Sequence, residues 1–408
     1  MKICYITRDY RTEIPWNGVS TYVSTIASIL AKRGHEIHII CQAKTREKKY
    51  TKENIHIHAI TPYQPSYYNK NYKNNIFLKF IDKIIGRILY TMSFNIKSYY
   101  IYQDIQKTRR CDILESEDGG GAGLLPTFDK KTPVITFLHT PWTLIDELNQ
   151  NRGVDRMLIK ILEKQQLKRS NHVNANSFSI IKKISKLFDI KLNSKVIRYP
   201  INISDINLKA DKKSPISGKY LLYYGAIEKR KGIITLVKAM QGVFLKDKII
   251  KLVIIGNEPI NTVKENSLKE HALKELSKNS KRIIFLPQQE PNKIFSIVKK
   301  SSCVVLPSIW EAFGYTCLES MALGKIVIAT SGSGFEEQIK RNGKNGYLFE
   351  PENHKELAKK ILYVLKLSKK EKKKIEDNAK KRAKEFDNKI IINKIIEHYM
   401  KIATDYEK

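Results

Sequence analysis

The chain has 408 residues, 42% of them hydrophobic, and this length suggests two globular domains, each large enough for its own core. No apolar run approaches the roughly 18 residues of a membrane-spanning helix, which excludes an integral membrane protein of that kind. The formal net charge of +33 either indicates an anionic partner, such as nucleic acid, a membrane surface or a phosphorylated substrate, or reflects a drift in composition.

The cysteines and the amino terminus indicate a reducing compartment. Five scattered cysteines lie mostly in apolar runs without a C-x-x-C pair, so we expect buried thiols and no zinc site. The first residues read as a buried strand rather than as a signal peptide. A cytoplasmic location is therefore predicted.

The amino-terminal half alternates strand and helix signals. A helix is expected at 19–33, and the pattern predicts a doubly wound parallel α/β sheet. The expected strands are 2–7, 36–41, 55–60, 112–115, 134–139 and 172–175.

Two residues of this half stand where open α/β sheets bind ligands, beyond the carboxyl ends of strands. Gly18 begins the first helix after the loop 8–18, and His139 ends the strand at 134–139 before a Thr-Pro loop. The acidic and glycine-rich stretch 112–123 ends another strand and is a candidate wall of the acceptor site.

Residues 62–110 interrupt the alternation with many tyrosines, phenylalanines and lysines and few acids. Such a segment could lie on an anionic membrane surface, with aromatic rings among the headgroups and lysines on the phosphates. The alternative is a pair of amphipathic helices that cover the sheet.

A lysine-rich polar stretch at 205–219 suits a linker, and the strand–helix alternation then restarts. We expect an amino-terminal domain at 1–200 and a carboxyl-terminal domain at 201–385. The segment 386–408 is expected to be helical.

A glycine turn with cations follows the first strand of the second half. Gly225 is followed by Arg230 and Lys231, and this combination suits a diphosphate because lysine supplies a point charge and arginine a fork of donors.

The run from Cys303 to Gly334 predicts a strand, a loop, a helix and a second strand. Its Glu311 and Glu319 lie eight positions apart, which on one helix would separate them by about 12 Å and 80°. If both serve one site, Glu311 lies in the loop and Glu319 in the helix, and they hold two parts of an elongated ligand. Amides near Phe313 and Gly314, at the helix start, would favour an anionic group between them.

This run resembles the E-x7-E region of retaining glycosyltransferases of family 4, through the segments P-S, E-A-F-G, L-E-S-M-A and G-K-I-V-I-A-T. The turn after Gly225 resembles the family's G-R-L-x-x-x-K-G, with Lys231 at the phosphate-binding lysine, but Ala226 replaces the family's arginine. Arg230 could supply the missing charge, or Lys231 and amides could act alone.

The resemblance implies the GT-B fold, which is α/β with two Rossmann-like domains facing across a cleft, and a last helix that returns to the first domain. It also implies roles for the site residues. Glu311 and Lys231 act in catalysis with His139, which contacts the donor sugar. The residues expected to bind the donor are Gly18, Gly225, Arg230, Phe313, Gly314 and Glu319, and Glu319 is expected to bind the ribose hydroxyls.

The predicted function is the transfer of a hexose or N-acetylhexosamine, with retention, from a nucleotide diphosphate sugar to a glycan, glycolipid or other hydroxyl acceptor. A UDP-sugar is favoured, and a GDP-mannose-dependent mannosyltransferase is the alternative. No D-x-D motif is present, so we expect no metal and no cofactor beyond the co-substrate. Two other functions are possible alternatives from the sequence. One is a sugar-nucleotide epimerase or a glycan phosphorylase of the same fold, and the other is a basic nucleic-acid-binding protein.

Overall fold

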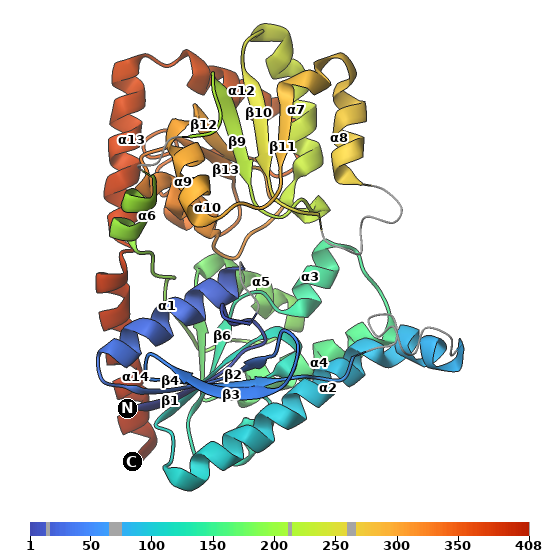
Figure 1. Cartoon of the computed structure of the whole chain (residues 1–408), viewed down its shortest axis with the longest axis vertical. Helices are drawn as coiled ribbons and strands as arrows, with labels where there is room; N and C mark the ends of the chain where they lie inside the picture. The colour runs from blue at the N-terminus through green and yellow to red at the C-terminus, as the bar shows by residue number, and fades with distance from the viewer. Residues whose placement is uncertain (14–16, 65–75, 211–213, 259–266, 408) are drawn as a thin grey trace. The chain divides into compact units, whose positions relative to one another are not determined.

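The computed structural model describes residues 1–13, 17–64, 76–210, 214–258 and 267–407 (Figure 1). The chain forms two compact units. The first contains Met1–Pro200 together with Ile391–Lys408, and the second contains Ile201–Ile390. The sequence prediction of two parallel α/β domains is confirmed by the two sheets described next.

The first unit is built on an eight-stranded sheet in the order β3-β4-β2-β1-β5-β6-β7-β8, in which only the edge strand β3 runs antiparallel to its neighbour. β3 was not expected from the sequence, because its residues are polar and mostly exposed. The strands are β1 Lys2–Ile6, β2 Glu36–Gln42, β3 Lys48–Lys52, β4 Ile55–Ile60, β5 Ile113–Glu117, β6 Val134–Leu138, β7 His172–Ala175 and β8 Ser194–Val196.

Two helices of the first unit begin at side-chain caps. Asn17 and Ser20 form a reciprocal capping box at the start of α1, and Ser177 caps α5. The helices are α1 Gly18–Lys32, α2 Ile76–Thr108, α3 Trp142–Leu148, α4 Val154–Arg169 and α5 Phe178–Phe188, with short 3₁₀ turns η2 Gly119–Gly121 and η3 Leu125–Phe128.

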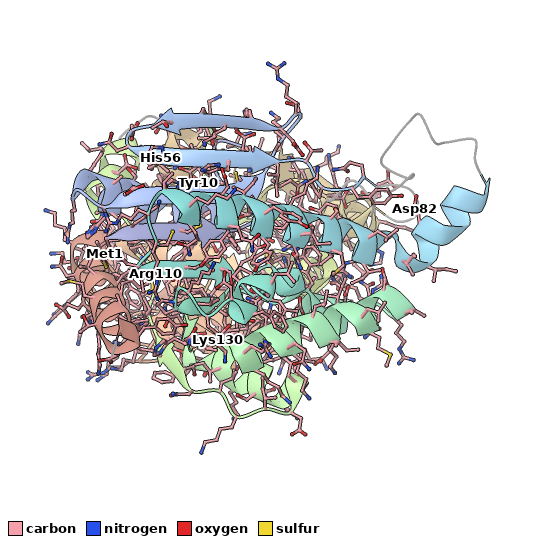
Figure 2. The ribbon with its side chains drawn as sticks, turned by 90° about the horizontal axis from the view of Figure 1, so that it is seen from below. Met1, Tyr10, His56, Asp82, Arg110 and Lys130 are labelled. Atoms are coloured by element: carbon pink, nitrogen blue, oxygen red, sulfur yellow. The ribbon has the colours of Figure 1, made fainter. Side chains whose placement is uncertain are left out.

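In the described part of 62–110 the chain forms the single helix α2 rather than a helix pair. Figure 2 shows it crossing the unit from Asp82 towards Arg110 and Met1. Its Phe94 and Tyr102 are buried against the sheet. The cation of Arg87 lies 2.5 Å from Asp146, and that of Lys97 lies 2.6 Å from Glu47. The alternative interpretation, a helix that covers the sheet, is therefore correct for the buried face of α2. Residues 65–75 lie outside the described residues.

The second unit contains a fully parallel sheet of six strands in the order β11-β10-β9-β12-β13-β14. Its apolar core includes side chains from the central strands and from the helices on one face. The strands are β9 Tyr220–Tyr224, β10 Lys251–Ile255, β11 Ile283–Leu286, β12 Cys303–Leu306, β13 Val327–Thr330 and β14 Tyr347–Phe349.

Helices and short 3₁₀ turns surround this sheet (Figure 1). The capping box of Ser368 and Glu371 starts the very basic helix α13. The helices are α6 Ile203–Ala210, α7 Ile233–Lys246, α8 Leu268–Leu276, α9 Pro291–Lys300, α10 Tyr315–Ala322, α11 Phe335–Gln338, α12 His354–Lys366 and α13 Lys369–Lys384, and the 3₁₀ turns are η4 Lys229–Lys231 and η6 Ser277–Arg282.

The last helix, α14 Asn388–Glu407, packs on the first unit from Ile391 onward. Its His398 Nε2 lies 2.9 Å from the side-chain oxygen of Asn174, and the hydroxyl of Tyr399 donates a 2.5 Å hydrogen bond to Glu115. Within the described residues, no helix is both long and apolar enough to cross a membrane.

Candidate active site

In the second unit, the loops after β9 and β12 are held in direct contact. The backbone amide of Ile309 donates a 2.8 Å hydrogen bond to the carbonyl of Arg230. Gly232 has φ 72°, and a Cβ atom built on it would lie 1.8 Å from the carbonyl oxygen of Pro307. Only glycine therefore permits both this backbone conformation and the close approach of the two loops. The result is that Lys231 is fixed beside the loop that carries Glu311.

Lys231 and Glu311 form an ion pair at this junction. The ammonium of Lys231 is bound to Glu311 Oε1, and Arg230 Nη1 lies 4.0 Å from the same oxygen. Ser308 Oγ donates to it at 3.4 Å. Burial alone would raise the pKa of Glu311, but the charges of Lys231 and Arg230 outweigh burial and lower it. Glu311 is therefore an ionised carboxylate at neutral pH.

Arg230 is positioned by a second carboxylate. Its Nε lies 2.7 Å from Glu228 Oε2, and both side chains remain partly exposed. The guanidinium thus stands between Glu228 and Glu311, with part of its fork open to solvent. Gly225 and Ala226 begin the same loop, and the amide of Gly225 donates to the carbonyl of Ile255 at 3.0 Å.

The start of α10 lies beyond Glu311 in the same loop. Gly314 precedes the helix with φ 83°, and a Cβ there would lie 2.2 Å from the ring of Phe335. The ring of Phe313 is buried, with its centroid 5.9 Å from that of Phe386, and Gln338 donates a 2.7 Å hydrogen bond to the Phe313 carbonyl. These residues can therefore meet a ligand through their backbone rather than through side chains.

Glu319 lies within α10, whereas Glu311 lies in the loop before it. The hydroxyl of Tyr224 lies 3.3 Å from Glu319 Oε2, 2.7 Å from the carbonyl of Thr316 and 3.0 Å from Ser320 Oγ. Burial raises the pKa of Glu319 to about 7, although the hydrogen bond from Tyr224 opposes this shift. The two carboxylates therefore occupy different electrostatic environments.

In the first unit, Gly18 is the first residue of α1 and follows the cap Asn17. The side chain of Asn17 accepts a 2.7 Å hydrogen bond from the amide of Ser20. This cap accounts for the local sequence without a ligand.

His139 follows β6 and is buried in the first unit. Its Nδ1 is hydrogen-bonded to the hydroxyl of Tyr199, its ring stacks on Phe137 at 4.8 Å between centroids, and its amide donates to Asp118 at 3.1 Å. Burial lowers the pKa of His139 to about 3, so its imidazole is neutral near pH 7. Asp118 belongs to the acidic and glycine-rich stretch 112–123, so this stretch contacts His139 directly through the Asp118 carboxylate.

The structure brings together the sequence-predicted residues of the second unit, which are Gly225, Arg230, Lys231, Glu311, Phe313, Gly314 and Glu319, on the loops after β9 and β12 and on α10. Gly18 and His139 belong to the other unit. Three supporting residues were missed: Tyr224, Glu228 and Ser308. Each of the three lies next to a recognised motif. Its contact with the site is made to a residue that is distant in the sequence or is set by the shape of a loop, so residue spacing in the sequence did not indicate it.

Two family models match the chain. The model of glycosyltransferase family 4 matches residues 16–205, and the model of group 1 glycosyl transferases matches residues 205–382. The chain belongs to the group 1 glycosyltransferases of the family 4 type. The two family models meet at residue 205, close to Pro200, where the chain passes from the first unit to the second.

Proteins similar in sequence to this glycosyltransferase are themselves named as glycosyltransferases. An uncharacterized glycosyltransferase of Methanocaldococcus jannaschii is 27% identical over 344 residues, which cover 82% of this chain and 86% of the relative. A Campylobacter jejuni N-acetylgalactosaminyltransferase that acts on a diphospho-undecaprenol-linked sugar is 26% identical over 265 residues, 64% of this chain and 67% of the relative.

Solved structures show that this glycosyltransferase has the GT-B fold. Sucrose-phosphate synthase from Thermosynechococcus elongatus superposes with a TM-score of 0.73 at 16% identity and covers 99% of each chain. The Anabaena protein HepE in complex with UDP and glucose gives a TM-score of 0.70 at 17% identity, covering 98% of this chain and 99% of that protein. The sequence predictions of the family and of the fold are thus confirmed.

Proposed function

We propose that this glycosyltransferase moves a hexose or N-acetylhexosamine, with retention, from a UDP-sugar to a hydroxyl of a glycan or a lipid-linked acceptor. The observation that carries the proposal is the cation pair beside Glu311. Lys231 and Arg230 lie on one loop, next to the loop that leads to the start of α10. A diphosphate matches two cations and helix-terminal amides.

In the proposed cycle, donor binding separates the pair that Lys231 and Glu311 form. The ammonium transfers to the diphosphate, with Arg230 beside it, and Glu311 is left to accept hydrogen bonds from hydroxyls of the transferred sugar. When the bond between the anomeric carbon and the diphosphate breaks, negative charge grows on the leaving oxygen and positive charge on the anomeric carbon. Lys231 and Arg230 stabilise the first, and the carboxylate of Glu311 stabilises the second.

Retention follows in this proposal from attack on the same face. The acceptor hydroxyl forms the new bond to the anomeric carbon as the diphosphate leaves, and its proton passes to the departing phosphate oxygen. The proposal assigns the carboxylate of Glu311 to the developing charge and that of Glu319, within α10, to the ribose, so neither acts as the nucleophile of a double displacement.

Glu319 is proposed to accept hydrogen bonds from the two ribose hydroxyls. Tyr224 orients its carboxylate from β9. In the first unit, Tyr199 engages Nδ1 of His139, which leaves Nε2 as the nitrogen that can contact the donor sugar. Gly18 is proposed to let the backbone at the start of α1 approach the donor.

Protein cations take the place of a metal in this proposal, so transfer proceeds without a divalent ion or a cofactor. Lys231 and Arg230 supply the positive charge that a metal would otherwise give to the diphosphate.

We also propose that the enzyme works in the cytoplasm at the membrane surface. Its relatives include the Campylobacter enzyme, whose name specifies an undecaprenol-linked acceptor, and a Salmonella lipopolysaccharide N-acetylglucosaminetransferase. Leu89, Ile96 and Tyr100 of α2 are exposed, and at 100° per residue they fall within about 40° of one another on the helix. Such a stripe could enter the headgroup layer.

The proposal is tested by a donor screen in the presence of EDTA. UDP- and GDP-linked sugars are incubated with and without lipid-linked acceptors, and the released nucleotide and the product anomer are measured. Acceptor-dependent UDP release with a retained anomer supports the proposal. Use of GDP-mannose alone would establish the mannosyltransferase instead, and a requirement for a divalent ion would refute metal independence.

A further inference from the structure

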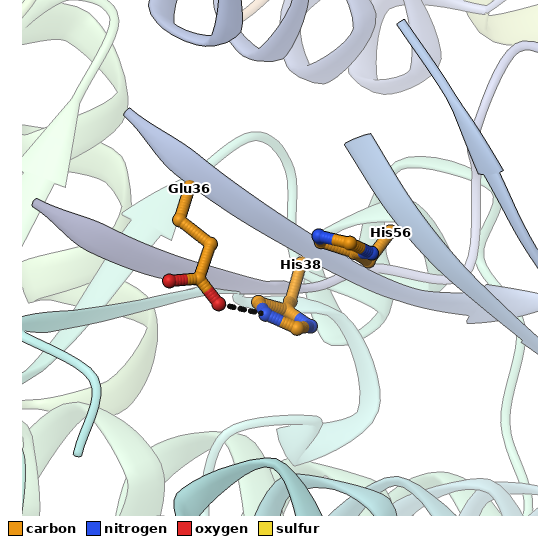
Figure 3. Close-up of side chains that lie close together, drawn as sticks. All are labelled: Glu36, His38 and His56. Carbon is orange, nitrogen blue, oxygen red and sulfur yellow. Dashed lines mark hydrogen bonds and ion pairs between the residues drawn. The ribbon is translucent and has the colours of Figure 1, made fainter. Parts of the chain in front are cut away.

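The starting ends of β2 and β4 carry a cluster of metal-binding side chains on one face of the first unit's sheet. Glu36 and His38 are two positions apart on β2, so they project to the same side. In the parallel register His38 lies opposite His56 of β4. Figure 3 shows these three side chains close together. One ligand atom from each lies within 4.8 Å of the others.

Glu36 and the two imidazoles already interact. Glu36 Oε1 lies 3.0 Å from His38 Nε2, and the rings of His38 and His56 stack with their centroids 4.7 Å apart. Glu36 and His56 are partly exposed, whereas His38 is buried. The side chain of His38 is therefore held in place by its surroundings, whereas the side chains of Glu36 and His56 can move towards an ion.

The other nitrogens of both imidazoles are held by partners. His38 Nδ1 lies 3.4 Å from His58 Nε2, and His56 Nδ1 lies 3.1 Å from the hydroxyl of Thr51 on β3. Ligand histidines in metal sites are usually oriented in this way, through the nitrogen that does not bind the metal. Nε2 of His38 and of His56 is then the nitrogen left to bind an ion.

Lys2 is the main charge that opposes a cation here. Its ammonium lies 3.6 Å from Glu36 Oε1. However, an ammonium has three donors, and Lys2 has three other acceptors, which are the carbonyls of Ile105 and Arg109 and the hydroxyl of Thr108 at 3.0–3.1 Å. The carboxylate of Glu36 is therefore not needed to satisfy Lys2.

We propose that Glu36, His38 and His56 bind one zinc ion, or a similar divalent transition metal, with water as a further ligand. Two imidazoles and one carboxylate are a common zinc ligand set, with bonds of about 2.0–2.1 Å. Tetrahedral binding at that length needs ligand atoms about 3.4 Å apart, so the side chains must draw together by at most roughly 1.4 Å. Binding through Nε2 requires the neutral tautomer of His38 that carries its proton on Nδ1, where it can be donated to His58 Nε2.

The bound ion would link β2 to β4 and take no part in sugar transfer. Its ligands lie at the beginning of these parallel strands, whereas His139 follows the carboxyl end of β6 in the same sheet. The sequence expectation of no zinc site rested on cysteine spacing, and this cluster contains none. The inference is independent of the proposed donor and acceptor.

Cobalt(II) titration of the untagged, chelator-treated 408-residue chain tests the site. The expected result is visible d–d absorption that saturates at one ion per chain and disappears when zinc is added. Zinc is also expected to raise the Tm. Glu36→Gln and His56→Gln should each weaken binding by about tenfold or more, while His271→Gln, at an exposed histidine of α8, should leave it unchanged.

His58→Gln separates orientation from ligation. Its effect is expected through His38, so affinity should fall by about tenfold with the stoichiometry still one. Circular dichroism of each metal-free variant shows whether it is folded. An absence of the d–d band, or equal affinity in the wild type and in both folded ligand variants, would overturn the proposal.

Discussion

The ammonium of Lys231 is bound to the carboxylate of Glu311, although the two residues lie 80 positions apart in the chain. Gly232 and the hydrogen bond from Ile309 to Arg230 bring the two loops together. Each member of the pair has the charge that suits one end of a breaking glycosidic bond. In the proposed cycle a donor separates these two charges.

Removal of the Glu311 carboxylate should slow transfer more than it weakens donor binding. Glu311→Ala is expected to lower kcat by roughly 100-fold, because a group that stabilises transition-state charge is lost. The donor KM should stay similar or fall, since Lys231 is released for the diphosphate. Initial rates across donor concentrations measure both constants. Glu336→Ala, at an exposed glutamate of α11, is the control, and a wild-type kcat in Glu311→Ala would contradict the assignment.

Arg230 is predicted to replace the arginine that the family carries at the position of Ala226. Arg230→Ala should weaken donor affinity about tenfold or more, since a charge-assisted hydrogen bond is worth about 1.5–3 kcal/mol. Adding Ala226→Arg to that variant should recover part of the loss. Calorimetry with the preferred donor gives the affinities. If Arg230→Ala binds the donor as the wild type does, Lys231 and backbone amides hold the diphosphate without it.

Gly232→Ala should destabilise the second unit because it combines a positive φ with a clash against Pro307. The expected loss exceeds about 1 kcal/mol in the free energy of unfolding. Gly218→Ala is the matched control, since Gly218 has φ 83° but no atom within 4 Å of an added Cβ. Urea midpoints compare the two variants. An equal shift would show that backbone strain alone, and not the contact between loops, explains the effect.

Local patterns were enough to predict most of the parallel strands, although not the short β8 and β14. They also predicted the division of the E-x7-E stretch into a loop with Glu311 and a helix with Glu319. These features depend on apolar runs and helical geometry within a few residues. β3 escaped detection because an exposed edge strand such as Lys48–Lys52 needs no apolar alternation. For residues 62–110 the sequence left open a membrane-surface segment or a helix pair, because aromatic and basic residues occur all along it; the single helix α2 was not predicted.

The supporting contacts of the site could not be predicted in the same way. Tyr224, in β9, reaches Glu319 of α10 across 95 positions of the chain. The place of Gly232 against Pro307 depends on how β9 and β12 pair in the sheet. The histidines of β2 and β4 likewise meet through strand register rather than through spacing.

Donor binding should weaken as the pH falls through about 7. Burial raises the pKa of Glu319 to about 7, so below this pH the carboxyl is protonated and loses an acceptor for the ribose hydroxyls. The lowered pKa of Glu311 keeps it ionised, and His139, with a pKa lowered to about 3 by burial, stays neutral. Donor Kd measured across this range should show one transition in the wild type and none in Glu319→Gln. A transition that persists in Glu319→Gln would assign it to another group.

The most direct test of the account is a calorimetric titration of UDP-sugars and GDP-sugars into the wild-type chain and into Lys231→Ala. We expect saturable binding of at least one UDP-sugar, with affinity reduced in the variant by tenfold or more because a charge-assisted contact of about 1.5–3 kcal/mol is lost. Absence of binding by any nucleotide sugar to the folded wild type, or equal affinity in Lys231→Ala, would contradict it.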